Sequence, residues 1–251
     1  MPHRILIVND DGLSSPGISI LARLAKTLGS CVCVAPDRNQ SGSSQSLSLD
    51  RPLSFTSVAA EIPSWKVNGT PADCVFLALS GAIPGLTTAL GGAPDLVLSG
   101  INQGENLGDD VLYSGTVGAA SVAALWRCPA VAISAPKNAA IIDLSAAAAL
   151  ELIKYGLLNQ ASLWNINLPL RPHRGVTLTW QGLRSPAGEP TPNPEGMSSV
   201  WLGSFGDGIP EPGNDFFAVA NDLISLTPLT TSRCDLPALQ QARRWLQEMA
   251  L

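Results

Sequence analysis

The chain has 251 residues and a net charge of −5, and only 14% of its residues are charged. Apolar residues make up 45%, which is enough to bury a large core and excludes a mainly disordered protein. The acidic balance argues against a nucleic-acid polymer or an anionic membrane as partner, because Lys and Arg in excess bind both. The chain has two histidines, so a multi-histidine metal site is excluded.

Cysteine usage and the first residues bear on the compartment. The five cysteines are odd in number and never spaced C-x-x-C, so neither a disulfide framework nor a zinc site is predicted. The chain runs from Met1 directly into an apolar strand, without the hydrophobic region of a signal peptide. No stretch approaches the roughly 20 apolar residues of a membrane helix. A reduced, cytoplasmic protein without a membrane partner is expected.

Short apolar runs alternate with amphipathic segments over the first 160 residues. Buried strands are predicted at residues 5–8, 31–35, 95–99 and 130–134. Helices are predicted from Pro16 to Leu28, from Pro71 onward, after Ser114 to about Trp126, and from Asp143 to about Leu158. The alternation predicts an α/β fold with a mostly parallel sheet.

The character of the chain changes after about residue 160. Residues 181–215 hold six prolines and seven glycines, and such a long irregular stretch predicts a functional loop, an arm or a disordered segment. Aromatic residues favour an arm that packs on another surface, such as a second subunit; they are Trp201, Phe205, Phe216 and Phe217. We expect one α/β domain over 1–251, with a core to about 175, an irregular or β-rich arm at 176–234 and an amphipathic helix at 235–250.

Polar residues with glycines follow three of the predicted strands. Asn9-Asp10-Asp11-Gly12 follows the first, and a segment containing Ser41-Gly42-Ser43 follows the second. The third leads through Asn102 and Asn106 to Ser114-Gly115-Thr116. Because ligands bind at the carboxyl ends of parallel strands, these groups predict one binding site.

Asp10 and Asp11 are adjacent carboxylates, which repel each other unless a cation or solvent separates them. The alternative is that one caps the following helix while the other is solvated. All the candidate ligands are oxygen donors, which suits Mg²⁺ or Mn²⁺ and disfavours zinc. Asp109 and Asp110 are either further ligands or structural turn residues.

Two hydroxyl-bearing segments are candidates for binding phosphate. Ser41-Gly42-Ser43 exposes its backbone, and Ser114-Gly115-Thr116 opens a helix whose free N–H groups and dipole attract anions. Ordinary helix caps are the alternative for each segment. The usual phosphatase and NTPase signatures are missing: Cys-x5-Arg, Asp-x-Asp, Arg-His-Gly, the P-loop and the Gly-x-Ser-x-Gly elbow.

Several linked motifs, in order, closely resemble the SurE family of survival-protein nucleotidases. They are ILIVNDDG at 5–12, VAPDRNQSGSS at 34–44, NGTPADC at 68–74, SGIN at 99–102, NLGDD at 106–110 and YSGTV at 113–117. The resemblance implies a Rossmann-like core with helices on both faces. It also implies a C-terminal extension used to assemble a homodimer or homotetramer.

The resemblance further implies a divalent-metal-dependent phosphatase acting on nucleoside 5′- or 3′-monophosphates, with one ion, Mg²⁺ or Mn²⁺, per subunit. The family's metal ligands map onto Asp10, Asp11, Ser41 and Asn102. Its phosphate pocket maps onto Asn106, Ser114, Gly115 and Thr116. Asp10 or Asp11 is then the group that orients or deprotonates the attacking water.

Two other functions fit the same residues. One is hydrolysis of another small phosphoester, such as a sugar phosphate, or of short polyphosphate. The other is a sensor that binds a nucleotide or a metal without turnover. A pocket deep enough for a base favours nucleotides over a linear polyphosphate, and release of more than one phosphate per chain excludes a sensor.

Overall fold

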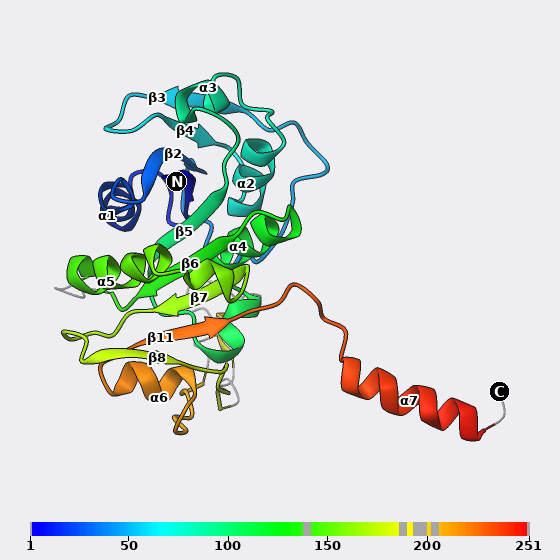
Figure 1. Cartoon of the computed structure of the whole chain (residues 1–251). Coiled ribbons are helices and arrows are strands. Elements are labelled where there is room, and N and C mark those ends of the chain that lie inside the picture. Colours follow the sequence, from blue (N-terminus) through cyan, green and yellow to red (C-terminus); the bar gives the residue numbers. More distant parts are fainter. Residues whose placement is uncertain (1, 138–141, 186–189, 193–199, 202–205, 250–251) are drawn as a thin grey trace.

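One nine-stranded sheet organises the molecule, with strand order β3-β4-β2-β1-β5-β6-β7-β11-β8 (Figure 1). The computed structural model describes residues 2–137, 142–185, 190–192, 200–201 and 206–249. The strands β4, β2, β1, β5, β6 and β7 are parallel, whereas β3 and β11 run antiparallel to their neighbours β4 and β7. The mostly parallel α/β sheet expected from the sequence is therefore confirmed.

The strands of this sheet have short and well-defined bounds. They are β1 His3–Val8, β2 Gly29–Pro36, β3 Phe55–Val58, β4 Ser64–Val67, β5 Leu96–Gln103, β6 Ala130–Ala135, β7 Leu163–Asn167, β8 Gly175–Leu178 and β11 Leu223–Pro228. Residues alternate between the two faces, so Ile5 and Ile7 join one hydrophobic cluster while Leu6 and Val8 join the other.

Helices cover both faces of the sheet. Their bounds are α1 Pro16–Ala25, α2 Pro71–Leu79, α3 Leu86–Leu90, α4 Gly115–Leu125, α5 Ile142–Lys154, α6 Asp215–Ala220 and α7 Leu236–Glu248. Helices α1 and α5 bury apolar residues in the cluster with Ile5, and α2, α3 and α4 in the cluster with Leu6 (Figure 1). The expected helices on both faces are confirmed. None of the helices in the described ranges is long and apolar enough to cross a bilayer.

The order of the strands creates a switch point beside β1. The chain moves outward from β1 through β2 to β4, then returns to β5 on the other side of β1 and continues to β6 and β7. The carboxyl ends of β1 and β5 therefore lie next to each other where the winding direction reverses. In open α/β sheets, ligands bind at such a point.

The prediction that the first helix extends to Leu28 is wrong. Helix α1 ends at Ala25, and Leu28 N–H donates to the Ala25 carbonyl in the turn that follows. Gly29, expected to end the helix, instead begins β2 opposite His3. A Cβ at residue 29 would lie 1.9 Å from the His3 carbonyl oxygen, so the close approach requires glycine. The predicted helix at 143–158 similarly ends at Lys154 and is followed by a 3₁₀ turn at Leu157–Asn159.

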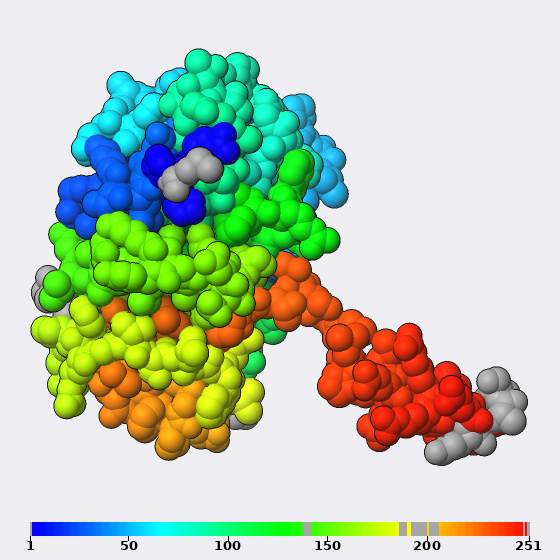
Figure 2. Space-filling view, in the orientation of Figure 1, coloured from blue at the N-terminus to red at the C-terminus, as the bar shows by residue number. Residues whose placement is uncertain are grey.

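The C-terminal extension contributes to the main sheet. Its strand β11 pairs with β7, β8 adds to the edge of β11, and the short pair β9 Thr191–Pro192 and β10 Val200–Trp201 lies apart. Of the aromatics predicted to pack on another surface, Phe216 is buried within its own chain and Phe217 is half-buried. Phe205 and the Trp201 side chain lie outside what the structure describes. Helix α7 projects away from the body (Figures 1 and 2).

Candidate active site

A cavity of about 270 Å³ lies where the carboxyl ends of β1, β2 and β5 meet. Six predicted site residues line it: Asp10, Ser41, Gly42, Asn102, Asn106 and Ser114. Four others, Asp11, Ser43, Gly115 and Thr116, do not line the cavity but contact its walls. Three separate strand ends thus contribute to one pocket.

The turn after β1 is built to present two consecutive carboxylates. Asn9 is buried, and its Nδ2 donates to the Gly12 carbonyl at 3.0 Å and to Ser15 Oγ at 2.8 Å. Gly12 has a φ of +93°, a left-handed conformation that favours glycine. Ser15 caps α1. The carboxylates therefore do not cap the helix, which was the structural alternative for this motif.

Asp10 is an almost fully buried carboxylate with 3% of its surface exposed. Its Oδ1 accepts a hydrogen bond from Thr116 Oγ1 at 2.5 Å. Burial raises the pKa of Asp10, against the hydrogen bond from Thr116, and the neighbouring charge of Asp11 raises it further. In the described part of the chain no Arg, Lys or His forms an ion pair with Asp10. A bound cation would stabilise its charged form.

Asp11 is half-buried and more weakly held. Its Oδ1 accepts from Asn39 Nδ2 and its Oδ2 from the Gln103 backbone N–H, each at 3.3 Å. Burial raises the pKa of Asp11, while the Gln103 hydrogen bond and the charge of Lys137 act in the opposite direction. Asp11 thus links the loop after β2 to the end of β5.

The N-terminus of α4 packs tightly against Asp10. Ser114 Oγ caps the helix by accepting from Val117 N–H at 3.1 Å, as expected of a serine that begins a helix. A Cβ at Gly115 would lie 2.6 Å from Ser43 Oγ and 2.9 Å from Asp10 Cβ. Only glycine allows this approach, so the Ser114-Gly115-Thr116 motif is shaped by the carboxylate beside it.

Ser41 and Asn102 each present at the cavity a side-chain oxygen that forms no hydrogen bond among the described residues. The Ser41 N–H donates to Asn39 Oδ1 at 2.9 Å, which fixes the backbone of the loop. Asn102 Nδ2 donates to the Gly104 carbonyl at 2.8 Å, so its Oδ1 is the atom left to accept a hydrogen bond or bind a cation.

The donor set fits a hard divalent cation. In the described ranges no three His, Cys, Asp or Glu side chains form a metal-binding group. A cation at this cavity would therefore be held by the two carboxylates of Asp10 and Asp11 and by neutral oxygens. Ser41 and Asn102 supply such oxygens, and carboxylate, amide and hydroxyl oxygens are what Mg²⁺ and Mn²⁺ prefer.

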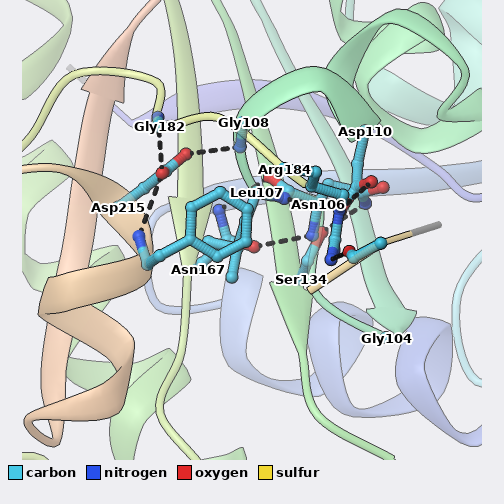
Figure 3. A network of polar contacts seen from close by, with 12 residues as sticks. Gly104, Asn106, Leu107, Gly108, Asp110, Ser134, Asn167, Gly182, Arg184 and Asp215 are labelled. Atoms are coloured by element: carbon cyan, nitrogen blue, oxygen red, sulfur yellow. Dashed lines mark hydrogen bonds and ion pairs between the residues drawn. The ribbon is translucent and has the colours of Figure 1, made fainter. Parts of the chain in front are cut away.

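The loop between β5 and α4 (residues 104–114) is anchored through Asn106. Its backbone N–H donates to Asn167 Oδ1 at 2.8 Å and its carbonyl accepts from Asn165 Nδ2 at 2.8 Å. Its side-chain Nδ2 donates to Ser134 Oγ at 2.7 Å (Figure 3). The hydrogen bonds of Asn106 thus tie the loop to β6 and β7.

Some residues of the cavity carried no individual signal in the sequence. Gln103, Glu105 and Tyr113 lie within the strand-end segments singled out there, but Arg184 comes from the Pro/Gly-rich arm and belongs to no motif. Asp110 forms an ion pair with Arg184, which favours the structural role over the role of a metal ligand for this residue.

The fold and the cavity together define a class of protein. A doubly wound α/β sheet carries, at its switch point, two carboxylates with neutral oxygen donors, beside a helix N-terminus. These are features of an α/β protein that binds a phosphate group together with a hard divalent cation.

The chain belongs to the SurE family. The family model described as Survival protein SurE matches residues 5–187. The chain is 39% identical to the 5′-nucleotidase SurE of Acinetobacter baylyi, over 96% of this chain and 99% of that protein. It is 41% identical to the 5′-nucleotidase SurE of Pseudomonas putida, over 97% and 98% of the two chains. The crystal structure of the SurE protein from Aquifex aeolicus superimposes with a TM-score of 0.77 at 34% identity, over 96% and 98% of the chains.

Proposed function

We propose that this protein is a divalent-metal-dependent nucleotidase that hydrolyses nucleoside monophosphates to nucleoside and phosphate. The observation that carries the proposal is Asp10, a buried carboxylate that lines the cavity and forms no ion pair with a cationic side chain in the described ranges. Relatives at about 40% identity over nearly the whole chain are named 5′-nucleotidases, which supports this substrate class.

The residues that would hold the cation are Asp10, Asp11, Ser41 and Asn102. When bound, a divalent cation polarises a phosphoryl oxygen and lowers the pKa of a water molecule. Thr116 orients the Asp10 carboxylate through its hydroxyl, and Asp10 or Asp11 accepts a hydrogen bond from the attacking water. We propose Mg²⁺ or Mn²⁺, because these ions prefer oxygen ligands.

The phosphate of the substrate is assigned to the N-terminal end of α4. Unpaired N–H groups in the first turn of a helix stabilise an anion, and they also stabilise the charge that develops on the phosphoryl oxygens. Ser114, Gly115 and Thr116 form that turn. We assign Asn106, Ser41 and Gly42 to the other sides of the phosphate pocket, with Ser43 packed against Gly115.

The decisive experiment measures phosphate release from a panel of substrates. The panel contains nucleoside 5′- and 3′-monophosphates, a sugar phosphate and short polyphosphate, each with Mg²⁺, with Mn²⁺ and with EDTA. We expect many turnovers per chain on both classes of nucleotide and none in EDTA. Full activity in EDTA would contradict the metal assignment, and a preference for polyphosphate or the sugar phosphate would contradict the substrate class.

We also propose that the chain forms a homodimer or homotetramer through its C-terminal extension. Helix α7 stands away from the body (Figure 2). It exposes a set of large apolar side chains: Leu236, Leu239, Trp245, Leu246 and Met249. An exposed apolar face of this kind is typical of an association surface. We expect Trp245→Glu to lower the mass in solution, measured by light scattering, and Gln240→Glu to leave it unchanged; a monomeric wild type would contradict the proposal.

The cysteines support a cytoplasmic location. All five thiols are unpaired, and four of them are buried. Unpaired thiols are typical of a reducing compartment. In cellular fractionation we expect the protein in the cytosolic fraction with its thiols reduced, and its recovery from another fraction would contradict this location.

A further inference from the structure

One residue, Asp110, makes most of the hydrogen bonds that hold the second half of the β5–α4 loop. The Asp110 carbonyl accepts from Tyr113 N–H at 3.0 Å and from Ser114 N–H at 2.9 Å. Its carboxylate Oδ2 accepts from Leu107 N–H at 3.2 Å. Asp110 thus bonds to residues before and after it, including the serine that caps α4. A displacement of Asp110 would displace Ser114 and with it the first turn of that helix.

Arg184, which lies in the C-terminal extension, forms an ion pair with the Asp110 carboxylate. Arg184 Nε donates to Asp110 Oδ1 at 2.8 Å, and Nη2 donates to Oδ2 at 2.5 Å (Figure 3). The third nitrogen, Nη1, donates to the Gly206 carbonyl at 3.0 Å, and the guanidinium lies 5.1 Å from the centre of the Phe216 ring. The planar fork of arginine is suited to this two-point contact, which lysine cannot reproduce.

A second carboxylate of the extension holds the same loop. Asp215 is fully buried; its Oδ2 accepts from Gly108 N–H at 2.7 Å and its Oδ1 from Gly182 N–H at 2.8 Å (Figure 3). The Gly108 carbonyl accepts from Gln181 Nε2 at 3.1 Å. The segment Gln181–Gly182, just before Arg184, is therefore attached to Gly108 of the loop both directly and through Asp215. This attachment places the Arg184 guanidinium next to Asp110.

The geometry also bears on whether Arg184 binds substrate directly. Arg184 lines the cavity together with Asp10 and Ser114. However, its three guanidinium nitrogens each donate to Asp110 or Gly206, which uses three of the five N–H groups and orients the guanidinium toward Asp110. The remaining N–H groups on Nη1 and Nη2 make a direct contact with phosphate the alternative that the double variant tests. The contacts favour an action of Arg184 through Asp110.

We propose that Arg184 is a positioning residue for the phosphate pocket. Through Asp110 it holds Ser114 and the N-terminus of α4 in the orientation that receives the phosphate. This inference rests on the proposed function for its substrate, but binding of inorganic phosphate tests it separately from turnover.

The test compares wild type, Arg184→Gln, Asp110→Asn and the double variant. Binding of inorganic phosphate is measured by calorimetry at saturating Mn²⁺, and turnover of adenosine 5′-monophosphate is measured in parallel. We expect each single variant to weaken phosphate binding about 10- to 100-fold, as for other residues that orient a binding group. The double variant should be no weaker than the weaker single variant, because both changes remove the same contact. In turnover, KM should rise accordingly.

Two controls separate positioning from a general loss of structure. Arg171→Gln removes another arginine–aspartate contact, between Arg171 and Asp222 at 3.0 Å, and should leave phosphate binding at the wild-type level. Binding of Mn²⁺ alone should not change in Arg184→Gln, because the proposed metal ligands lie outside the loop. Arg184→Lys keeps the charge without the fork and should bind phosphate more weakly than wild type but more tightly than Arg184→Gln.

The outcomes are distinguishable. Unchanged phosphate binding in Arg184→Gln overturns the inference, as does a double variant whose loss is the product of the two single losses, since Arg184 would then act on the substrate itself. If Arg184→Gln does not unfold cooperatively, Arg184→Lys decides, and wild-type phosphate affinity there overturns the inference. A wild type without turnover overturns the proposed function, while phosphate binding still decides the role of Arg184.

Discussion

Asp10 and Asp110 line the same cavity, but their surroundings differ. Both are buried, with 3% and 8% of their surface exposed. Asp110 is held by the guanidinium fork of Arg184, whereas Asp10 accepts its side-chain hydrogen bond from the neutral hydroxyl of Thr116. Within the described residues, Asp110 has a compensating charge and Asp10 has none.

This difference separates structural from functional carboxylates. A buried charge without a partner destabilises a fold, so it persists where something other than stability requires it. The raised pKa of Asp10, caused first by burial, reflects that cost. A cation bound from solution would compensate the charge of Asp10, as the Arg184 guanidinium compensates that of Asp110. Whether a buried carboxylate has a cationic partner is therefore informative about its role, even for two carboxylates such as Asp10 and Asp110 that line the same cavity.

The largest expected effect concerns activity. We predict that Asp10→Asn lowers kcat/KM by about 1000-fold or more, because a bound cation supplies several kcal/mol of transition-state stabilisation and each 1.36 kcal/mol is tenfold in rate. Asp110→Asn should cost only about 10- to 100-fold, since it acts through position. Phosphate-release assays at saturating Mn²⁺ measure both. Asp143→Asn, at the exposed ion pair with Arg23, is the matched control and should stay at the wild-type level.

The assignment of Asp10 as the functional carboxylate and Asp110 as the structural one would be contradicted if Asp10→Asn retained more activity than Asp110→Asn. That result would move the essential carboxylate from the end of β1 to the β5–α4 loop. It would also leave the unpaired buried charge of Asp10 without a functional reason.

A smaller effect, on stability, should have opposite signs at the two residues. In EDTA at pH 8, Asp110→Asn should lower the free energy of unfolding by about 1–3 kcal/mol, because it leaves the Arg184 charge without its partner. Asp10→Asn should raise it by about 1–3 kcal/mol, since it removes an unpaired buried charge and keeps an acceptor for Thr116. Urea unfolding monitored by circular dichroism measures both.

The pH dependence of the Asp10→Asn effect follows from the raised pKa of Asp10. The folded protein binds this proton more tightly than the unfolded chain, so wild-type stability decreases as the pH rises from the ordinary pKa of 3.8 through the folded value. The gain from Asp10→Asn should therefore be largest at pH 8 and shrink as the pH falls toward 4. A gain that grew on acidification would contradict the assignment of Asp10 as a desolvated carboxylate.

The candidate site was accessible from the sequence because its parts are local. Asp10, Ser41 and Asn102 each follow or end an apolar run that reads as a buried strand, and parallel strands bring their carboxyl ends together. The Ser114 cap was predicted from the residues of one turn. Short-range patterns of this kind depend on the backbone period and on helix-capping chemistry, both of which operate over a few residues.

The contacts of Arg184 with Asp110 and of Asp215 with Gly108 could not be predicted from the sequence, because they depend on tertiary structure alone. Arg184 is 74 residues from Asp110, and Asp215 is 107 residues from Gly108. Their meeting requires β11 to pair antiparallel with β7 and β8 to add to the edge of β11, which carries the extension back to the cavity. The secondary-structure preferences of neighbouring residues do not specify that pairing, because it depends on which distant strand covers the edge of β7. The sequence by itself determined the carboxylates, hydroxyls and amides of the site; only the tertiary structure decided which of those carboxylates has a partner.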